Sequence, residues 1–470
     1  MASELYELSA TNLIALYQAK KASPVEAAQS VLKRIDTLQS TYNAFCVIDP
    51  EHTLQAARES ENRWSKGQAA GLVDGIPTTI KDLMISKGWP TLRGSKTVNP
   101  DQDWSQDAPI VARMRDHGAV FVGKTTTPEF GWKGVTDSPL TGTTRNPWNP
   151  VRTPGGSSGG AAVAAALGMG TLNIGSDGGG SIRMPAGFCG IFGIKPTFGV
   201  VPAYPQSTMG NLSHHGPMTR TVTDAALMLT VISEPDPRDW SAGPYRMINY
   251  HENLQQDISG LRIAYSPTLG YARVDEHVSS MVEQSVRRFA ELGAEVVEVD
   301  PGIEDPIEAM ITLWSVGLAV LIDGIPKHKH DLMDQPILAL AEQGRKCTSL
   351  TVRNAEKARE QLAVKINLFL EEYDLLITPQ LPLTAFEAGN EVPPGSGMTR
   401  WWEWSPFTYP FNLTQHPAAT VPCGLANDGL PVCLQIITSR FNEHHLLQAC
   451  KAFEETQPFV MPAIAGNSRP

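Results

Sequence analysis

The sequence of 470 residues has few cysteines and no arrangement of them that suggests a metal or a disulfide framework. Its six cysteines are scattered from Cys46 to Cys450, and no two form a Cys-x-x-Cys pair. A zinc site of the cysteine type is therefore not indicated, and neither is a small disulfide-bonded fold. Buried free thiols in a reducing compartment are the expected state.

Long apolar runs are also absent. The N-terminal stretch MASELYELSATNLIALYQAKK lacks the uninterrupted apolar core of a signal peptide. No apolar stretch approaches the roughly 18 residues that a membrane span needs. The sequence therefore predicts a soluble, cytoplasmic protein without a membrane partner.

Basic runs are missing as well, and the formal net charge is −11. Such a balance argues against nucleic acids and anionic membranes as main partners. Apolar residues make up 41% of the chain and charged residues 19%, which is typical of a globular protein.

Helical signals dominate the start of the chain. Ser23-Pro24-Val25-Glu26 combines an N-cap serine, a proline at the first helical position and a glutamate two residues after it. We expect a helical N-terminal segment over residues 1–65. Between about 70 and 235, short apolar runs such as 119–122 and 171–174 alternate with glycine-rich turns, and 161–167 is a small-residue helix. This mixture predicts an α/β sheet.

The remainder contains strand-like runs at 261–265, 294–299 and 375–379, with helical patterns at 274–292 and over most of 305–370. No tandem repeat and no sharp boundary divide the chain. We therefore expect one domain, 1–470, with a smaller helical insertion around 260–370.

Three segments carry candidate chemistry. The first, GIPTTIKD, ends an apolar, β-prone run with Lys81. Burial there would lower the pKa of the lysine, although a lysine after a strand is often a solvated surface residue.

The second segment, PGGSSGG, places Ser157 and Ser158 between pairs of glycines, which permit backbone angles that other residues avoid. A flexible turn is the alternative. The lysine of a phosphate-binding loop is missing.

The third segment is GSDGGGSIRMP, in which three glycines precede Ser181. Successive backbone N–H groups beside a serine hydroxyl can form an oxyanion hole, although a plain turn has the same composition.

A serine nucleophile needs a base. None of the eleven histidines is near these segments in sequence, and the pair His214-His215 is the nearest. A buried neutral lysine can replace histidine, with a second hydroxyl carrying the proton between lysine and nucleophile. The histidine pair stays open as an alternative.

Taken together, these segments resemble the amidase-signature hydrolases. The resemblance spans nearly the whole chain and includes GIPTTIKD, GKTTTPEFGW, TPGGSSGGAAVAAALGMGTLNIGSDGGGSIRMPAGFCGIFGIKPT, GPMTR, YDLLITPQLP and AATVPCGLANDGLPVCLQII. The separation of the two serines, 181 − 157 = 24 residues, matches the family's spacing.

The resemblance implies a mixed central β-sheet covered by helices on both faces, and acyl transfer without a metal or organic cofactor. Ser181 resembles the family's nucleophile, and Lys81 resembles its base. Ser157, which a cis peptide holds in the family, resembles the proton carrier between them. The N–H groups of Gly178, Gly179, Gly180 and Ser181 are expected in the oxyanion hole. The supporting residues implied are Ser158, Asp177 and Arg183. Family members often form dimers, so a homodimer is one expectation.

The substrate is a small amide by the same resemblance, hydrolysed to a carboxylate and an amine or ammonia. The aromatic segment 401–409 predicts a pocket for apolar or aryl amides, with anilides, carbamates or esters as further candidate substrates. The residues expected to form it are Trp401, Trp402, Trp404, Phe407 and Tyr409. These aromatic side chains could equally belong to the core or to an interface. Two other functions stay open: the glutaminase-like A subunit of a tRNA-dependent amidotransferase, and an inactive scaffold.

Overall fold

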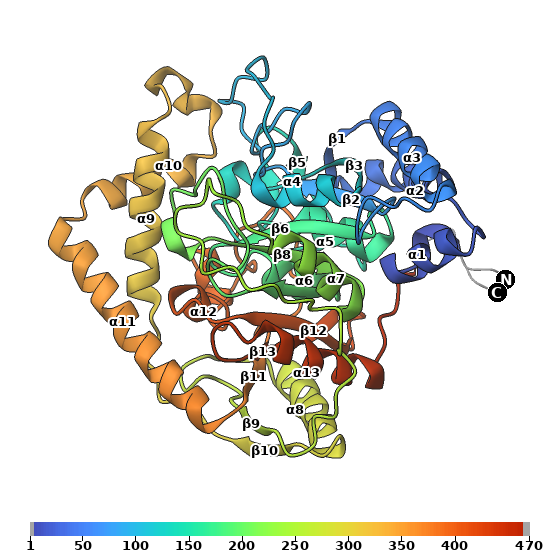
Figure 1. Cartoon of the computed structure of the whole chain (residues 1–470). Coiled ribbons are helices and arrows are strands. Elements are labelled where there is room, and N and C mark those ends of the chain that lie inside the picture. The colour runs from blue at the N-terminus through green and yellow to red at the C-terminus, as the bar shows by residue number, and fades with distance from the viewer. Residues whose placement is uncertain (1–3, 464–470) are drawn as a thin grey trace.

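The computed structural model describes residues 4–463, so the ends of the predicted domain 1–470 lie outside the described residues. Within that range an eleven-stranded mixed sheet runs through the molecule (Figure 1). Its strands, from one edge to the other, are β1 (Phe45–Ile48), β3 (Val120–Thr125), β2 (Pro77–Lys81), β6 (Leu172–Asp177), β8 (His214–Thr219), β7 (Phe192–Lys195), β12 (Ala418–Leu425), β13 (Pro431–Ile437), β11 (Leu375–Pro379), β9 (Arg262–Tyr265) and β10 (Glu295–Glu298).

The direction of the strands changes across this sheet. Strands β3, β2 and β6 are parallel, as are β11, β9 and β10, and an antiparallel middle separates the two groups. A separate ribbon is formed by β4 (Asp137–Ser138) and β5 (Gly142–Thr143). The sequence-based prediction of a mixed sheet is confirmed.

Helices cover both faces of the sheet. The α-helices are α1 (Ala10–Gln18), α2 (Pro24–Tyr42), α3 (Pro50–Ser65), α4 (Pro109–Asp116), α5 (Gly159–Leu167), α6 (Arg183–Cys189), α7 (Val222–Ile232), α8 (Glu276–Glu291), α9 (Ile307–Asp323), α10 (Gln335–Arg345), α11 (Ser349–Glu372), α12 (Pro410–Leu413) and α13 (Glu443–Thr456). Short 3₁₀ turns are η1 (Leu5–Glu7), η2 (Glu129–Gly131), η3 (Gly210–Leu212), η4 (Lys327–Leu332) and η5 (Trp401–Trp404).

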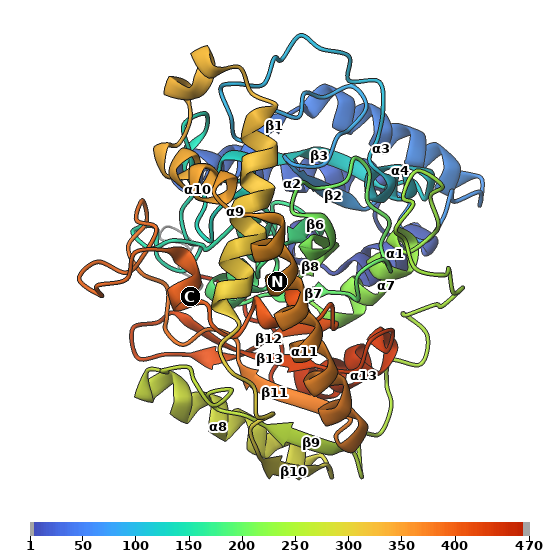
Figure 2. The same ribbon diagram turned by 90° about the vertical axis from the view of Figure 1, so that its left-hand side faces the viewer.

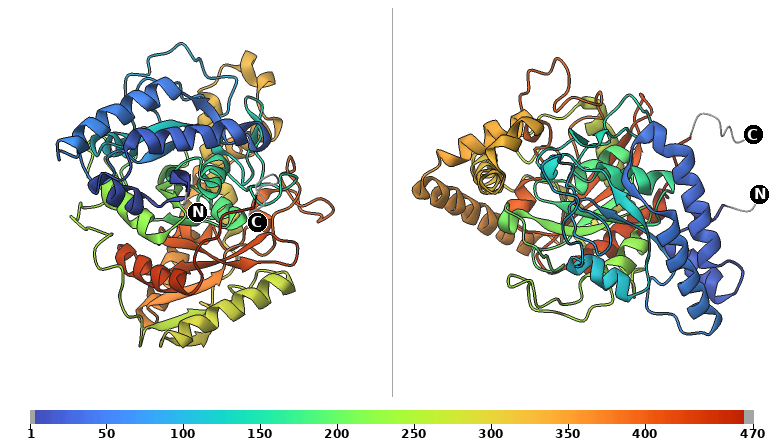
Figure 3. Two further views of the ribbon diagram at one scale, coloured as in Figure 1. Left: turned by 90° about the vertical axis from the view of Figure 1, so that its right-hand side faces the viewer. Right: turned by 90° about the horizontal axis from the view of Figure 1, so that it is seen from above.

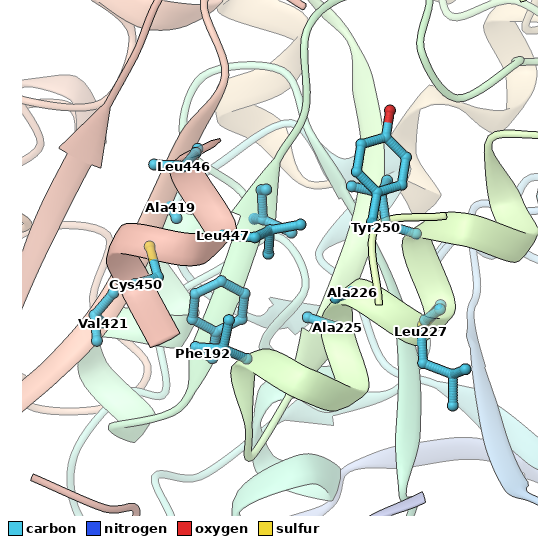
Figure 4. Packing of buried hydrophobic residues seen from close by; sticks show 14 of the residues in the cluster. Phe192, Ala225, Ala226, Leu227, Tyr250, Ala419, Val421, Leu446, Leu447 and Cys450 are labelled. Atoms are coloured by element: carbon cyan, nitrogen blue, oxygen red, sulfur yellow. The ribbon is translucent and has the colours of Figure 1, made fainter. Parts of the chain in front are cut away.

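Neighbouring residues of the central strands belong to different cores, as the alternation of side chains along a strand requires. On β13, Ile436 packs into the cluster that contains α4, α7, α8 and α13, whereas Ile437 packs into the cluster of α9, α10 and α11. Figure 4 shows the first cluster, where Leu447 and Cys450 of α13 face Phe192 of β7. A third cluster contains α5 and part of α2.

The N-terminal helices and the helices after residue 306 stand at opposite sides of the sheet. In Figure 1 α2 and α3 lie to the right and α9, α10 and α11 to the left, and the view from above in Figure 3 agrees. Figure 2 shows α9 and α11 crossing in front of the strands. The long helices after residue 306 therefore lie on the side of the molecule away from α2 and α3.

Local sequence signals account for several of these elements. Helix α2 begins at Pro24 because Ser23 Oγ accepts the Glu26 N–H at 3.2 Å and Glu26 accepts the Ser23 N–H at 2.8 Å, a complete capping box. The predicted strands and helices at 171–174, 261–265, 274–292, 294–299 and 375–379 are confirmed as β6, β9, α8, β10 and β11.

Two predicted segments are more mixed than expected. The N-terminal segment 1–65, whose first three residues lie outside the described part, contains the short apolar strand β1 as well as helices. The region around 260–370 contributes β9 and β10 to the edge of the main sheet in addition to four helices. The division of the chain into one domain with an insertion stays a prediction.

Candidate active site

The three predicted catalytic side chains meet at one edge of the sheet. Lys81 is the last residue of β2, and Ser181 lies in the turn between β6 and α6. Strands β2 and β6 are parallel neighbours, so their carboxyl ends lie together, which is where sites of α/β sheets form. Ser157 reaches the same edge from the loop that precedes α5.

Lys81 is completely buried and contacts three serine hydroxyls. Its Nζ lies 2.7 Å from Ser157 Oγ, 2.8 Å from Ser158 Oγ and 2.9 Å from Ser176 Oγ. Sequence reasoning did not assign a role to Ser176. Its position, one residue before Asp177 at the end of a buried strand beside β2, is the signal that could have found it.

Burial lowers the pKa of the Lys81 ammonium well below its usual value, and the charge of Asp177 opposes this only in part. Among the described residues no carboxylate forms an ion pair with Lys81. The surroundings therefore favour the neutral amine, which has a lone pair that can accept a proton.

The hydrogen bonds of Ser158 indicate where the lysine protons go. Its hydroxyl lies 3.1 Å from the Ser176 carbonyl, to which it donates, and it accepts the Ser176 N–H at 3.2 Å. Its contact with Lys81 must then be one in which the lysine donates. A neutral lysine has two N–H bonds and one lone pair, so the lone pair is left for Ser157 or Ser176.

Tight backbone packing holds the Ser157 loop. The Gly156–Ser157 peptide bond is cis, as the resemblance implied. A Cβ added to Gly156 would lie 2.6 Å from the Val135 carbonyl carbon, and one added to Gly159 would lie 2.2 Å from Thr136 Oγ1. Glycine is required at both positions because Val135 and Thr136 approach too closely to leave room for a side chain.

The carboxylate of Asp177 organises the turn that carries Ser181. It accepts the N–H groups of Gly180 at 2.7 Å and Ile182 at 3.2 Å, and it pairs with Arg183 at 2.9 Å. Arg183 in turn reaches Asn412 and Gln435, so the turn is tied to β13 and α12. Burial opposes ionisation of Asp177, but Arg183, Lys195 and Asn412 together hold its pKa well below the usual range.

Backbone donors remain free beside the Ser181 hydroxyl. In the described chain the N–H groups of Gly178, Gly179 and Ser181 have no protein acceptor. Gly180 differs from the prediction, because its N–H is already bound to Asp177. Its left-handed φ of 128° and a Thr408 side chain 2.5 Å from the position of an added Cβ explain why a glycine is needed there.

The two serine loops touch through the backbone, where the Ser158 N–H donates to the Ser181 carbonyl at 3.1 Å. No hydrogen bond joins the hydroxyls of Ser157 and Ser181 within residues 4–463. Both residues line one cavity, and catalytic hydrogen bonds often close only when substrate binds.

This cavity has an empty volume of about 980 Å³, including the solvent at its mouth. Its aromatic and aliphatic walls come mainly from Phe130, Trp314, Tyr204, Met209 and Leu321. Arg93, Gln206, His215 and several hydroxyl groups also line it, so the cavity offers both apolar and polar surface to a small molecule.

The predicted aromatic pocket of residues 401–409 is wrong. Trp401, Trp402, Trp404, Phe407 and Tyr409 are buried in the hydrophobic core, and none lines the cavity. They belong to the core because each ring packs against other side chains or satisfies its polar atom internally: Trp404 donates to the Glu391 carbonyl, and Tyr409 donates to Asp305 at 2.7 Å. Trp401 supports the site indirectly, since its ring centroid lies 5.6 Å from that of Trp314.

The histidine pair lies close by without touching either serine. His214 is oriented by the Leu212 carbonyl at 2.8 Å, and burial lowers its pKa well below the usual value. His215 lines the cavity, and burial together with Lys81 lowers its pKa to about 4. Neither ring has a hydrogen bond with Ser157 or Ser181 among the described residues.

Neither a metal site nor a membrane span is found among the described residues. Residues 4–463 contain no group of three or more His, Cys, Asp or Glu side chains placed to hold a metal ion. None of their helices is long and apolar enough to cross a membrane.

Comparison with known proteins decides the family. The model of the Amidase family matches residues 26–447. The chain belongs to the amidase family, and the predicted membership among amidase-signature enzymes is confirmed. It is therefore an enzyme that hydrolyses amides.

Relatives of this amidase include an acylamidase and an amidotransferase subunit. It is 36% identical over 466 residues to an acylamidase of Rhodococcus erythropolis, covering 97% of both chains. It is 32% identical to the A subunit of a glutamyl-tRNA(Gln) amidotransferase from Caldanaerobacter subterraneus subsp. tengcongensis, covering 99% of this chain and 100% of the relative.

A solved bacterial aryl acylamidase superposes on this amidase with a TM-score of 0.90 at 28% identity, covering 96% of both chains. A 6-aminohexanoate cyclic dimer hydrolase gives 0.87 at 26% identity, covering 97% and 98%. These likenesses confirm the predicted fold class.

Proposed function

We propose that this amidase cleaves apolar or aryl amides through an acyl-enzyme on Ser181, with Ser157 as proton carrier and Lys81 as base. The observation that carries the proposal is the environment of Lys81, a completely buried amine bound to three serine hydroxyls and to no carboxylate. Such an amine is poised to accept a proton near neutral pH.

The proposed reaction begins at Ser181. Ser181 Oγ attacks the amide carbon while its proton passes to Ser157 Oγ and the proton of Ser157 passes to Lys81 Nζ. The oxyanion is stabilised by the free N–H groups of Gly178, Gly179 and Ser181. Asp177 binds Gly180 and so keeps the turn in place.

The return of the proton completes acylation. Lys81 gives its proton back to Ser157, which protonates the departing nitrogen, and the C–N bond breaks. Water then attacks the Ser181 ester, its proton follows the same route, and the carboxylate is released. The protonated lysine of each half-reaction is stabilised by its three hydroxyl partners and by the nearby charge of Asp177.

Apolar or aryl selectivity is supported by the cavity walls, in place of the segment 401–409. Phe130, Trp314, Met209 and Leu321 offer ring and aliphatic surface next to Ser181. The similarity to an acylamidase and to an aryl acylamidase points the same way.

The glutaminase-like alternative has sequence similarity in its favour but lacks a counter-charge. None of the described residues that line the cavity is an aspartate or a glutamate, so the α-ammonium of glutamine would be unpaired there. We therefore expect acetanilide to exceed glutamine in kcat/KM, and the reverse order would favour the amidotransferase function.

Localisation and assembly belong to the same proposal. The six cysteines are free thiols, which suits work in the reducing cytoplasm. A homodimer remains the proposed assembly on the resemblance alone.

Ser181→Ala is the decisive variant. We expect kcat on an anilide to fall at least about 1,000-fold with an unchanged melting temperature, because only a hydroxyl is removed. A fluorophosphonate should label the native enzyme and not this variant. Ser86→Ala is the control, since Ser86 is buried, its hydroxyl has no hydrogen-bond partner within residues 4–463, and it lies outside the cavity.

Activity above a tenth of the native level in folded Ser181→Ala would overturn the nucleophile assignment. Absence of labelling in the native enzyme would instead favour the inactive scaffold.

A further inference from the structure

Arg93 is a positively charged side chain in the cavity, without a hydrogen-bond or ion-pair partner among the described residues. It lines the same cavity as Ser157 and Ser181. Within residues 4–463 its guanidinium forms no hydrogen bond and no ion pair. An arginine stays charged in a protein and carries five donors, so an arginine without an acceptor in a partly enclosed site is available to a ligand.

Asp82, the acidic residue whose charge acts on Arg93, is already paired with Lys124. Asp82 Oδ1 lies 3.0 Å from Lys124 Nζ, and Asp82 Oδ2 accepts the Gly94 N–H at 3.3 Å. Burial lowers the pKa of Arg93, and the charge of Asp82 opposes this. Because Lys124 offsets that charge, the cavity keeps the positive charge of the guanidinium.

The rest of the cavity adds no negative charge. Its described lining residues include no aspartate and no glutamate, although the whole chain has a formal net charge of −11. The protein as a whole is acidic, but the described lining of its cavity contains an arginine and no acidic residue. This arrangement favours an anionic group on the substrate and disfavours a cationic one.

The backbone holds Arg93 in place. Arg93 has a left-handed φ of 56° and Phe130 one of 52°, and the Phe130 N–H donates to the Arg93 carbonyl at 2.7 Å. Non-glycine residues rarely adopt this conformation. Here two residues that do so are linked by a backbone hydrogen bond, and both line the cavity. The loop therefore presents the arginine at the cavity wall.

The segment of Phe130, which is hydrogen-bonded to the Arg93 carbonyl, also indicates the side of the scissile bond. Gly131 follows Phe130, and a Cβ on Gly131 would lie 3.3 Å from Ser157 Oγ. The η2 segment, which is hydrogen-bonded to Arg93, thus packs beside the hydroxyl proposed to protonate the departing nitrogen. A group bound by Arg93 is accordingly placed on the amine part of the substrate.

We propose that Arg93 binds a carboxylate on the amine part of the amide, so that N-acylated amino acids and N-acylated aminobenzoates are preferred substrates. The proposal rests on the proposed function. A carboxylate matches the fork of a guanidinium through two parallel hydrogen bonds. The ring of an aminobenzoate would lie along the apolar wall, and its carboxylate would meet the arginine.

Two matched pairs of anilides test the proposal. On the amine side, 3- and 4-acetamidobenzoate are compared with the acetanilides in which a neutral acetyl group replaces the carboxylate. On the acyl side, succinanilate is compared with 4-oxo-N-phenylpentanamide, in which a methyl ketone replaces the carboxylate. The readout is kcat/KM, with kcat and KM resolved.

We expect the better acetamidobenzoate to exceed its neutral partner at least tenfold, mainly through KM. Arg93→Gln should lower kcat/KM for that anion by about 10- to 100-fold, the usual range for a hydrogen-bonded charge, and should change the neutral partner less than about threefold. Arg93→Lys should restore part of the loss. Arg145→Gln removes an exposed charge on another loop and should leave both values unchanged.

Any of three results would overturn the proposal. The amine-side pair could have equal kcat/KM, or Arg93→Gln could lower kcat/KM equally for both members of that pair. The third result is an Arg93-dependent preference that is confined to succinanilate. Hydrolysis of the neutral anilides, abolished in Ser181→Ala, tests the proposed function separately. Calorimetric binding of the acetamidobenzoate to Ser181→Ala, with and without Arg93→Gln, decides the role of Arg93 even where no anilide is hydrolysed. A similar affinity in both proteins would count against it.

Discussion

Strands β2 and β3 lie side by side, and each carries a completely buried lysine near its carboxyl end. The Nζ of Lys124 on β3 meets Asp82 at 3.0 Å, Thr91 Oγ1 at 2.5 Å and the Pro90 carbonyl at 3.1 Å. The Nζ of Lys81 on β2 meets three serine hydroxyls and no acid.

Burial lowers the pKa of both lysines, but Asp82 pulls that of Lys124 back up. Lys124 is therefore kept charged as half of an ion pair, whereas Lys81 is free to be neutral. The partners of a buried lysine, more than burial itself, separate a structural cation from a candidate base.

Replacing each lysine by methionine gives the largest expected contrast. Lys81→Met should lower kcat at least about 1,000-fold, because the proton of Ser181 loses its final acceptor. Lys124→Met should lower kcat per folded molecule less than tenfold, because Lys124 contacts no serine of the site. The folded fraction of each variant, measured by circular dichroism, corrects for unfolded protein. Similar losses in both variants would remove the distinction.

Stability should show the reverse order. Lys124→Met leaves Asp82 buried without its partner and should lower the free energy of unfolding by about 3–5 kcal/mol. Lys81→Met leaves no buried carboxylate unpaired and should cost less. Urea denaturation measures both, and Asp82→Asn added to Lys124→Met should recover part of the loss. A lack of recovery would show that the ion pair is not the cause.

The pH dependence of kcat/KM should follow the neutral fraction of Lys81. Below its lowered pKa this fraction falls about tenfold per pH unit, so activity should rise with pH and level off above that pKa. The rise should be unchanged in His215→Gln, because a histidine with a pKa of about 4 is already neutral across that range. Loss of the rise in His215→Gln would support the histidine base.

The smallest expected effect concerns selectivity. Trp314 lines the cavity, and its ring nitrogen donates to the Trp132 carbonyl at 3.2 Å. Trp314→Ala should lower the kcat/KM ratio of acetanilide to acetamide by about three- to tenfold, the value of one aromatic contact. Trp402→Ala should leave the ratio unchanged and destabilise the fold by about 3–5 kcal/mol. A larger change in the ratio for Trp402→Ala would return that residue to the pocket.

Sequence reasoning selected Lys81, Ser157 and Ser181, which the structure brings to one cavity or into contact with its lining, because each lies in a short segment whose chemistry is local. A lysine that ends an apolar strand and a serine after three glycines carry their own signal. The segment 401–409 failed for the opposite reason. A run of tryptophans and other aromatic residues fits a core and a pocket equally well, and only packing distinguishes them.

The same limit applies to Gly180, Ser176 and Arg93. Nothing in GGGS says which N–H will be taken by Asp177. Ser176 became visible only when β6 paired with β2, and Arg93 only when a loop between β2 and α4 reached the cavity.

The sequence by itself determined the cap of α2, several strand positions, the sheet-and-helix class and the segments that bear the reactive groups, since these depend on neighbours along the chain. The tertiary structure alone decided which buried lysine lacks a counter-charge, which N–H groups stay free and which aromatic rings face the substrate. Those properties depend on contacts between residues up to hundreds of positions apart, and Arg183, bound to Gln435, is one example. Burial and pairing set the charge of a group, and both are properties of the folded chain.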